Sequence, residues 1–311
     1  MSKYKSKEIV RVAYYYYKMG LTQSEIAERM AMSRQRANRI LKKALEENIV
    51  NITIVDMDKY NFELEGKLEE KFNLKQAVVI TCIDDKAIVP NLGIAGAEYL
   101  EDVLSKDDII GVTWGKTLSE VSKRLKPNKD LTVSSVQLVG GLNIAFTDLS
   151  PDEITRTIAK KLGGDSYILF APVIVDSKEI KDAIMSDYSL RTTFENMERC
   201  SYIIAGIGDL NQNTKLYKDE NFNDEFVHHL LSKGSVGDIG FRWFDKNGHA
   251  TEHNYDERTI GFNILKRLNN ALVVGIAGGE SKYDAILGAL KGEYIDVLIT
   301  DNETAERLSK S

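Results

Sequence analysis

Hydrophobic positions in the first 45 residues recur at helical spacing and fall into three short segments. The first, residues 7 to 19, ends at Gly20. Thr22 followed three residues later by Glu25 is a capping-box signature, which predicts that a second helix starts there. Ser33 caps a third helix after a tight turn at Ala31 and Met32. Apolar residues recur along this third helix at Ala37, Ile40, Leu41 and Ala44. The pattern predicts a three-helix head whose last two helices form a helix-turn-helix.

Two different patterns follow the head. Residues 49 to 55, IVNITIV, are β-branched and alternating, so they predict a strand that would form a small wing. Residues 56 to 75 are highly charged, and Leu64, Leu68 and Phe72 recur every four residues. This spacing predicts a connector helix with one narrow apolar stripe. The stripe could pack on the chain's own body or on a partner subunit, and packing on its own body is the commoner outcome.

From residue 76 onward, short apolar runs alternate with amphipathic helical patterns. Runs that are continuously apolar and alternate with helices are typical of a parallel sheet covered on both faces. We therefore predict an α/β fold with a head at 1–55 and a body at 56–311. The predicted strands are 77–82, 109–113, 135–139, 167–171, 202–207, 271–277 and 297–300.

Donor-rich side chains crowd the third helix of the head. Such side chains on one short helix suit the major groove of DNA, where Arg and Gln read base edges and Lys binds phosphates. Residues 1–55 carry a net charge of +6 while the rest carries −12, as expected if only the head meets a phosphate backbone. The alternative is a three-helix cap with a solvated basic surface. We predict DNA contacts from Thr22, Gln23, Ser33, Arg34, Gln35, Arg36, Arg39 and Lys42.

Glycines punctuate the ends of four predicted strands. They occur at Gly115 before Lys116-Thr117, at Gly140-Gly141, at Gly208-Asp209 and at Gly278-Gly279 before Lys282. Glycine lets the backbone approach a ligand, and a helix N-terminus behind it favours an anion. One such turn is common for steric reasons alone, but four in one sheet, one with a lysine, indicate a small anionic ligand. Asp238 follows Gly237 in a predicted loop and could accept hydrogen bonds from sugar hydroxyls, although it could equally be a turn residue.

The cysteines and histidines show no spacing typical of disulfide frameworks or metal sites. Cys82 and Cys200 have neither a disulfide framework nor metal-ligand spacing, and the four histidines do not fall into an HExxH context. No apolar run is long enough to span a bilayer, and Arg11 and Lys18 interrupt the N-terminal apolar segment, which argues against a signal peptide. We expect a cytoplasmic protein that uses no membrane, no metal and no cofactor.

Several strings together resemble the SorC family of bacterial sugar-responsive transcription regulators. They are LTQSEIAERMAMSRQRANRIL, GVTWGKTL, VQLVGGL, SVGDIGFRWFDKNG and VVGIAGGESKYDAILGALKG, in order along essentially the whole chain. The resemblance implies a helix-turn-helix head and a Rossmann-like body similar to phosphosugar isomerases and glucosamine-phosphate deaminases. It also implies a homotetramer or homodimer that leaves or rearranges on operator DNA when a phosphorylated sugar binds. A repressor is the expected sense of regulation.

The resemblance also implies an effector pocket. Carried over by position, it would use Gly115, Lys116, Thr117, Gly140, Gly141, Asn143, Asp238 and Lys282. Some family members have a lysine before the Gly-Gly pair, where this chain has Val139, so no Schiff-base amine is expected there. Others follow the pair with two threonines suited to a second phosphate, where this chain has Leu142 and Asn143. These departures leave the identity of the sugar open.

Two other functions compete with this interpretation. A sugar-phosphate isomerase or deaminase would need a general acid/base pair, for which Asp209, Asp238, His249 and His253 are the candidates. These residues form no recognisable cluster in the sequence, and the basic head would be unexplained, so we expect no enzyme and no catalytic residue. A regulator controlled by a protein partner is the third hypothesis, against which the glycine turns and Lys282 argue.

Overall fold

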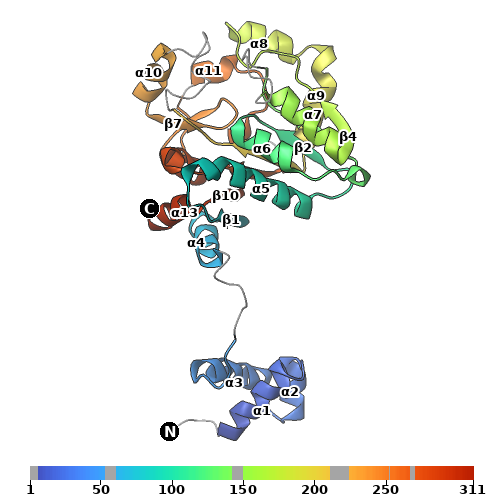
Figure 1. The fold of residues 1–311 in the computed structure, drawn as a ribbon, viewed down its shortest axis with the longest axis vertical. Helices are drawn as coiled ribbons and strands as arrows, with labels where there is room; N and C mark the ends of the chain where they lie inside the picture. The colour runs from blue at the N-terminus through green and yellow to red at the C-terminus, as the bar shows by residue number, and fades with distance from the viewer. Residues whose placement is uncertain (1–5, 53–60, 142–149, 211–223, 252, 267–269) are drawn as a thin grey trace. The chain divides into compact units, whose positions relative to one another are not determined.

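The computed structural model describes residues 6–52, 61–141, 150–210, 224–251, 253–266 and 270–311. The chain forms two compact units, Met1–Met57 and Asp58–Ser311. The sequence places the boundary between them after residue 55. In Figure 1 the head is blue, and the body runs from cyan to red.

The head consists of three helices, α1 (Ser6–Tyr17), α2 (Gln23–Arg29) and α3 (Arg34–Glu46). The predicted capping box is present: Thr22 N and Oγ1 lie 2.7 and 2.8 Å from Glu25 Oε2, and Glu25 N lies 3.3 Å from Thr22 Oγ1. Ser33 caps α3 by accepting from the backbone N–H of Arg36. The buried core of the head comprises Ile9, Val12, Ala13, Ile26, Ala37, Ile40, Leu41 and Ala44. The helix-turn-helix predicted from the sequence is therefore confirmed.

The wing prediction was wrong for the part of it that the structure describes. Residues 49–52 form no strand. The N–H groups of Ile49 and Val50 both donate to Ala44 O, at 2.9 and 3.0 Å, and so end helix α3. Ile52 is 61% exposed, because no neighbouring strand covers it among the described residues of the head. The Ala44 carbonyl, left without a partner inside the helix, thus accepts both N–H groups that a strand would have needed. Residues 53–55 lie outside the described residues.

The body is built on a seven-stranded sheet in which every neighbouring pair is parallel. In spatial order the strands are β1 (Gln76–Ile80), β10 (Val297–Asp301), β9 (Leu272–Ile276), β5 (Tyr202–Gly206), β2 (Ile109–Val112), β3 (Val133–Gln137) and β4 (Gly163–Tyr167). The chain builds outward from β2 to β4 and then returns to add β5, β9 and β10 on the other side. The topological switch point therefore lies between β2 and β5.

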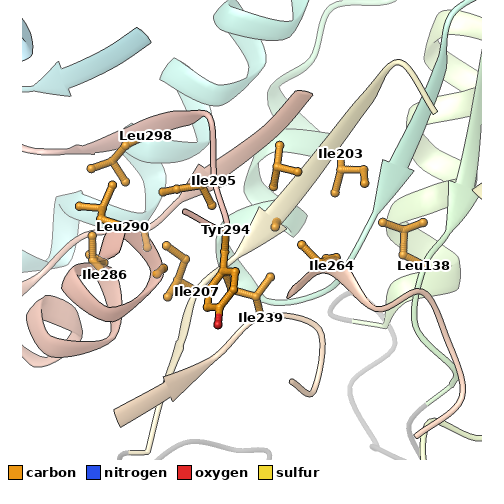
Figure 2. Packing of buried hydrophobic residues seen from close by; sticks show 14 of the residues in the cluster. Leu138, Ile203, Ile207, Ile239, Ile264, Ile286, Leu290, Tyr294, Ile295 and Leu298 are labelled. Carbon is orange, nitrogen blue, oxygen red and sulfur yellow. The ribbon is translucent and has the colours of Figure 1, made fainter. Parts of the chain in front are cut away.

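Helices cover both faces of this sheet, as the uninterrupted apolar strands predict. One face packs on α5 (Asp85–Val103), α6 (Lys116–Arg124) and α7 (Pro151–Leu162). The other face packs on α4 (Phe62–Phe72), α9 (Arg191–Glu198), α12 (Tyr283–Lys291) and α13 (Asn302–Lys310). Figure 2 shows the second core, in which Ile286 and Leu290 of α12 lie near Leu298 and Ile295. The predicted α/β fold is confirmed.

Strand β4 departs from the prediction. The sequence placed a strand at 167–171, but the strand is Gly163–Tyr167 and begins directly where α7 ends. Gly163 adopts φ +80° in this junction, and a Cβ there would lie 2.2 Å from Lys129 O. A glycine pair has low strand propensity, but a Cβ on Gly164 would lie 2.2 Å from Val133 O of β3, so the close approach to β3 requires glycine here. Ile168 and Leu169 are buried beyond it.

The connector helix α4 packs on its own body. Leu68 is fully buried, and Leu64 and Phe72 pack half-buried beside it. The side chains of Glu65 and Glu69 accept from the N–H groups of Val79 and Ala77, both at 2.9 Å. Because β1 lies at the edge of the sheet, these carboxylates satisfy backbone donors that no further strand pairs.

A small antiparallel sheet adjoins the carboxyl ends of the central strands. It consists of β6 (Gly208–Asp209), β7 (Ser235–Asp238) and β8 (Trp243–Asp245). Phe241 in the β7–β8 turn stacks on Trp114, which follows β2, with ring centroids 5.4 Å apart. This stacking ties the turn to the switch point of the large sheet. The remaining helices are α8 (Lys178–Met185), α10 (Asp224–Ser232) and α11 (His253–Arg258).

Candidate functional site

The outward side of helix α3 carries most of the predicted DNA-contacting residues. Arg34, Gln35, Arg36, Arg39 and Lys42 are exposed, whereas the apolar residues between them are buried against the rest of the head. The 3.6-residue period of the helix produces this separation. The arrangement places these long polar side chains on the solvent side of the head.

Three of the predicted DNA contacts already have structural partners. Arg36 Nη2 lies 2.8 Å from Glu8 Oε1 of α1, so this side chain also joins two helices. The hydroxyls of Thr22 and Ser33 serve as helix caps. Gln23, the first residue of α2, is half-buried. These residues remain predicted DNA contacts. Arg34, Gln35, Arg39 and Lys42 are exposed, and within the described residues none of these four caps a helix or joins two helices.

In the body, charged side chains converge at the switch point. Lys282 is the N-cap of helix α12 and extends its ammonium to the backbone oxygen of Ile207, just after β5. The charges of Asp209, Asp238 and Lys116 all act on this ammonium. Burial lowers the pKa of Lys282, and the two aspartates oppose that shift. Three predicted effector residues, Lys116, Asp238 and Lys282, are therefore brought together.

Asp238 lies at the end of β7 and is only 6% exposed. Its Oδ2 accepts from the N–H of Phe241 at 3.0 Å. Its partner across the small sheet is Gly208, where a Cβ would lie 2.1 Å from Asp238 Oδ1. Burial raises the pKa of Asp238 to about 6, while the Phe241 hydrogen bond and Lys282 act in the opposite direction. The sequence placed Asp238 in a loop, but it is a buried strand residue.

The raised pKa of Asp238 predicts a pH-dependent stability difference. The unfolded carboxyl has a pKa of about 3.9. The folded state binds this proton more tightly than the unfolded state does. The resulting contribution to stability is fully present below about pH 3.9 and is lost as pH rises through about 6, where the buried carboxyl ionises. Asp238→Asn should gain stability relative to the unmodified protein between pH 4 and pH 7, by on the order of 2 kcal/mol. Urea unfolding across this range measures the difference, and a difference that does not vary with pH would contradict the prediction.

The loop after β2 presents an open helix N-terminus. Gly115 adopts φ +118°, and a Cβ there would meet nothing within 4 Å. Helix α6 starts at Lys116, which is exposed, and Thr117 is buried beneath it. Because the first N–H groups of a helix are unpaired and its dipole is positive there, this end of α6 suits an anion.

The Gly140–Gly141 loop is constrained by the fold itself. The N–H of Gly140 donates to Ile260 O at 3.1 Å, and that of Gly141 donates to Ala171 O at 2.7 Å. A Cβ on Gly140 would lie 2.4 Å from Pro172 O. Close passage of two chain segments therefore explains this glycine, and both N–H donors have protein acceptors. Asn143 and Leu142 lie outside the described residues.

Sequence reasoning missed Asp209 as a member of the charged cluster. It considered Asp209 only as a loose acid/base candidate, whereas the pairing of β6 with β7 sets it opposite Gly237, next to Asp238. The Gly-Asp pair that ends an apolar strand was the available signal. By contrast, His249 lies at the β8 turn, where its Nδ1 is 3.4 Å from Asp245 Oδ2 and its side chain is 79% exposed. The side chain of His253 lies outside the described residues.

Metal-ligand clusters and membrane-spanning helices are both absent from the described residues. No cluster of three or more His, Cys, Asp or Glu in the described part of the chain could hold a metal ion. No helix there is long and apolar enough to cross a membrane.

A helix-turn-helix unit joined to a doubly wound α/β unit, with a charged cluster at the switch point, defines a DNA-binding protein with a small-ligand domain. Comparison with known families identifies both parts. The model described as "Putative sugar-binding domain" matches residues 58–310, and that for sigma-70 region 4 matches residues 5–47.

Curated relatives and solved structures agree with these matches. The deoxyribonucleoside regulator of Bacillus subtilis is 31% identical over 310 residues, covering 99% of both chains. The sorbitol operon regulator of Klebsiella pneumoniae is 31% identical over 306 residues, covering 97% of both. The crystal structure of that full-length regulator, SorC, superposes with a TM-score of 0.75 at 30% identity, covering 99% of this chain and 100% of that one.

The chain belongs to the SorC family of sugar-binding transcriptional regulators. It is accordingly a DNA-binding regulator of transcription whose body is a sugar-effector domain. The family resemblance drawn from the sequence is confirmed.

Proposed function

We propose that this regulator is a repressor whose operator binding is controlled by a phosphorylated sugar held at the switch point of the body. The convergence of Lys282, Lys116, Asp238 and Asp209 carries the proposal. Two ammonium groups and the N-terminus of α6 would hold the phosphate. The two carboxylates would accept hydrogen bonds from sugar hydroxyls.

The proposed effector contacts are those predicted from the sequence, with Asp209 added. Gly115 leaves space for a ligand beside Lys116 and Thr117, which begin α6. Because the donors of Gly140 and Gly141 already have protein acceptors, this loop would contribute van der Waals contact rather than N–H bonds. Asn143 completes the proposed set from outside the described residues.

Regulation requires more than one head. A helix of thirteen residues, α3, spans one half-site, and specific operators pair two half-sites at a fixed spacing. The proposal therefore includes a homodimer or homotetramer in which the effector changes the spacing of paired heads. The curated relatives named above are regulators, which supports reading the body as a sensor rather than an enzyme.

Thermal melting with a panel of sugars and sugar phosphates tests the proposal. We expect at least one sugar phosphate to raise the melting temperature, and its unphosphorylated sugar to have no effect, because ligand binding to the folded state stabilises it by mass action. The same compound should lower operator affinity in a DNA-binding assay. A shift only with a partner protein would instead favour protein control, and turnover that Asp238→Ala abolishes would show an enzyme.

A further inference from the structure

Residues 278–283 form the effector turn, which is held by the first residues of helix α13. The N–H of Gly279 donates to Asp301 Oδ2 at 2.7 Å and to Thr304 Oγ1 at 3.2 Å. A Cβ on Gly278 would lie 2.3 Å from Asp301 Oδ2, so the carboxylate approaches the turn closely. Asp301 and Thr304 are each 2% exposed. Because water is excluded and the acceptor is a carboxylate, these contacts fix the turn to α13.

Asp301 bonds to the turn and to the helix at once. It is the last residue of β10 and the N-cap of α13, where its Oδ1 accepts from the N–H of Thr304 at 3.0 Å. Its Oδ2 also accepts from Thr304 Oγ1 at 2.7 Å. Both carboxylate oxygens therefore have protein donors, one from the turn and two from the helix. An asparagine amide has one acceptor oxygen, so it could not occupy both positions.

Arg307 contacts the same turn further along α13. Its guanidinium lies 4.1 Å from the ring centroid of Tyr283, and its Nη1 lies 3.7 Å from Glu280 Oε1. The ion pair is exposed and contributes little, but the ring contact adds a cation–π attraction. Helix α13 thus contacts the effector turn before Lys282, at Gly279 and Glu280, and after it, at Tyr283.

Helix α13 also packs on the connector helix α4. Leu308 of α13 and Leu68 of α4 are fully buried in the same core. Lys71, near the end of α4, donates to the backbone oxygens of Ser309, at 3.3 Å, and of Ser311. Since α4 is the first helix of the body after the head in the sequence, α13 joins the effector turn to the element that follows the head.

A bound anion would change the position of the effector turn. The Lys282 ammonium donates to the backbone oxygen of Ile207. A phosphate that binds this ammonium competes with that carbonyl oxygen, so it favours positions of the turn in which the ammonium faces the phosphate. Helix α13 has to follow the turn, because otherwise the buried hydrogen bonds of Asp301 would break.

We propose that α13 transmits effector binding from the effector turn to α4, and that Asp301 is the positioning residue on which this transmission depends. This role rests on the proposed effector site at Lys282. Asp301 does not contact the ligand itself, because both of its carboxylate oxygens accept from protein donors. It keeps α13 fixed to the turn, so that occupation of the effector site alters α4 through a continuous series of packed groups.

Hydrogen exchange of the full-length protein with inorganic phosphate tests this role, with sodium chloride at equal ionic strength as the reference. In the unmodified protein, we expect phosphate to slow exchange in the effector turn, because binding stabilises the folded site. Exchange in α4 should change by at least about fivefold, the lower end of usual coupling between sites. In Asp301→Asn, phosphate should still slow exchange in the turn, but its effect on α4 should fall below about twofold, the usual limit of additivity.

Lys310→Met is the matched control, because Lys310 is an exposed cation of α13 whose ion pair with Glu306, at 3.6 Å, stays within the helix. It should leave the effect of phosphate on α4 unchanged. If Asp301 were only structural, Asp301→Asn would change α4 exchange equally with and without phosphate, and that result overturns the proposal. If Asp301→Asn does not fold, Arg307→Met takes its place, and an undiminished phosphate effect on α4 then refutes the transmission.

The effector turn and α4 distinguish failure of the transmission from failure of the effector site. A phosphate effect on the turn without one on α4 overturns transmission through α13 and leaves the effector site standing. No phosphate effect on the turn contradicts the phosphate site at Lys282 itself, and the transmission is then overturned with it.

Discussion

Replacing Lys282 by methionine is expected to give a protein that still binds its operator but no longer responds to sugar phosphate. The ammonium donates to the backbone oxygen of Ile207, the charges of Asp209 and Asp238 both act on it, and it is the partly buried cation of the switch-point cluster. Losing a buried, hydrogen-bonded charge from a binding site costs about 2–5 kcal/mol, so effector affinity should fall by at least about 30-fold. Calorimetry with the sugar phosphate identified by melting measures this loss.

The matched control for this change is Lys291→Met. Lys291 ends the same helix, α12, but is exposed, so its loss should leave effector affinity within about twofold. Operator affinity without effector should be the same for both variants and the unmodified protein. An effector affinity that survives Lys282→Met would place the phosphate elsewhere. Equal loss of operator binding would show that Lys282 supports the assembly instead.

Local signals made the head predictable. The Thr22–Glu25 box and the Ser33 cap are set by residues three positions apart, so the sequence contains the whole interaction. The predicted wing strand needed the N–H groups of Ile49 and Val50 for pairing with another strand. Both N–H groups instead donate to the carbonyl oxygen of Ala44. A strand forms only by hydrogen bonding to a neighbouring strand, and the sequence of one strand does not show whether that neighbour is present.

The same distinction applies to the proposed effector site. Lys282 was predicted because a lysine after a Gly-Gly turn at a strand end has a local meaning. Asp209 was missed as its neighbour, because the contact depends on antiparallel pairing between Gly208–Asp209 and a strand about thirty residues further on. The need for glycine at position 140 is also non-local, because the backbone that leaves no room for a Cβ there is that of Pro172.

Replacing Arg39 by alanine is expected to abolish specific operator binding while leaving the effector site intact. Arg39 is exposed on α3, between buried Ala37 and Ile40, so its removal takes nothing from the core of the head. A good contact between a side chain and a base is worth about 1–3 kcal/mol of discrimination, and paired heads lose it twice. Operator affinity should therefore fall by at least about 30-fold, as measured by fluorescence anisotropy with labelled operator.

Arg39 is a cleaner test than Arg36, whose ion pair with Glu8 joins α1 to α3. Arg36→Ala would combine lost DNA contact with a looser head, since an exposed pair of this kind contributes up to about 1 kcal/mol. Arg11→Ala is the matched control, because Arg11 is an exposed arginine of α1 and its loss changes the charge of the head equally. If Arg11→Ala weakened operator binding as much as Arg39→Ala, binding would follow net charge, and α3 would not be the element that reads the bases. Lys42→Ala should weaken binding to all sequences alike and reduce the salt dependence by about one counterion per head, because a phosphate contact carries no sequence information.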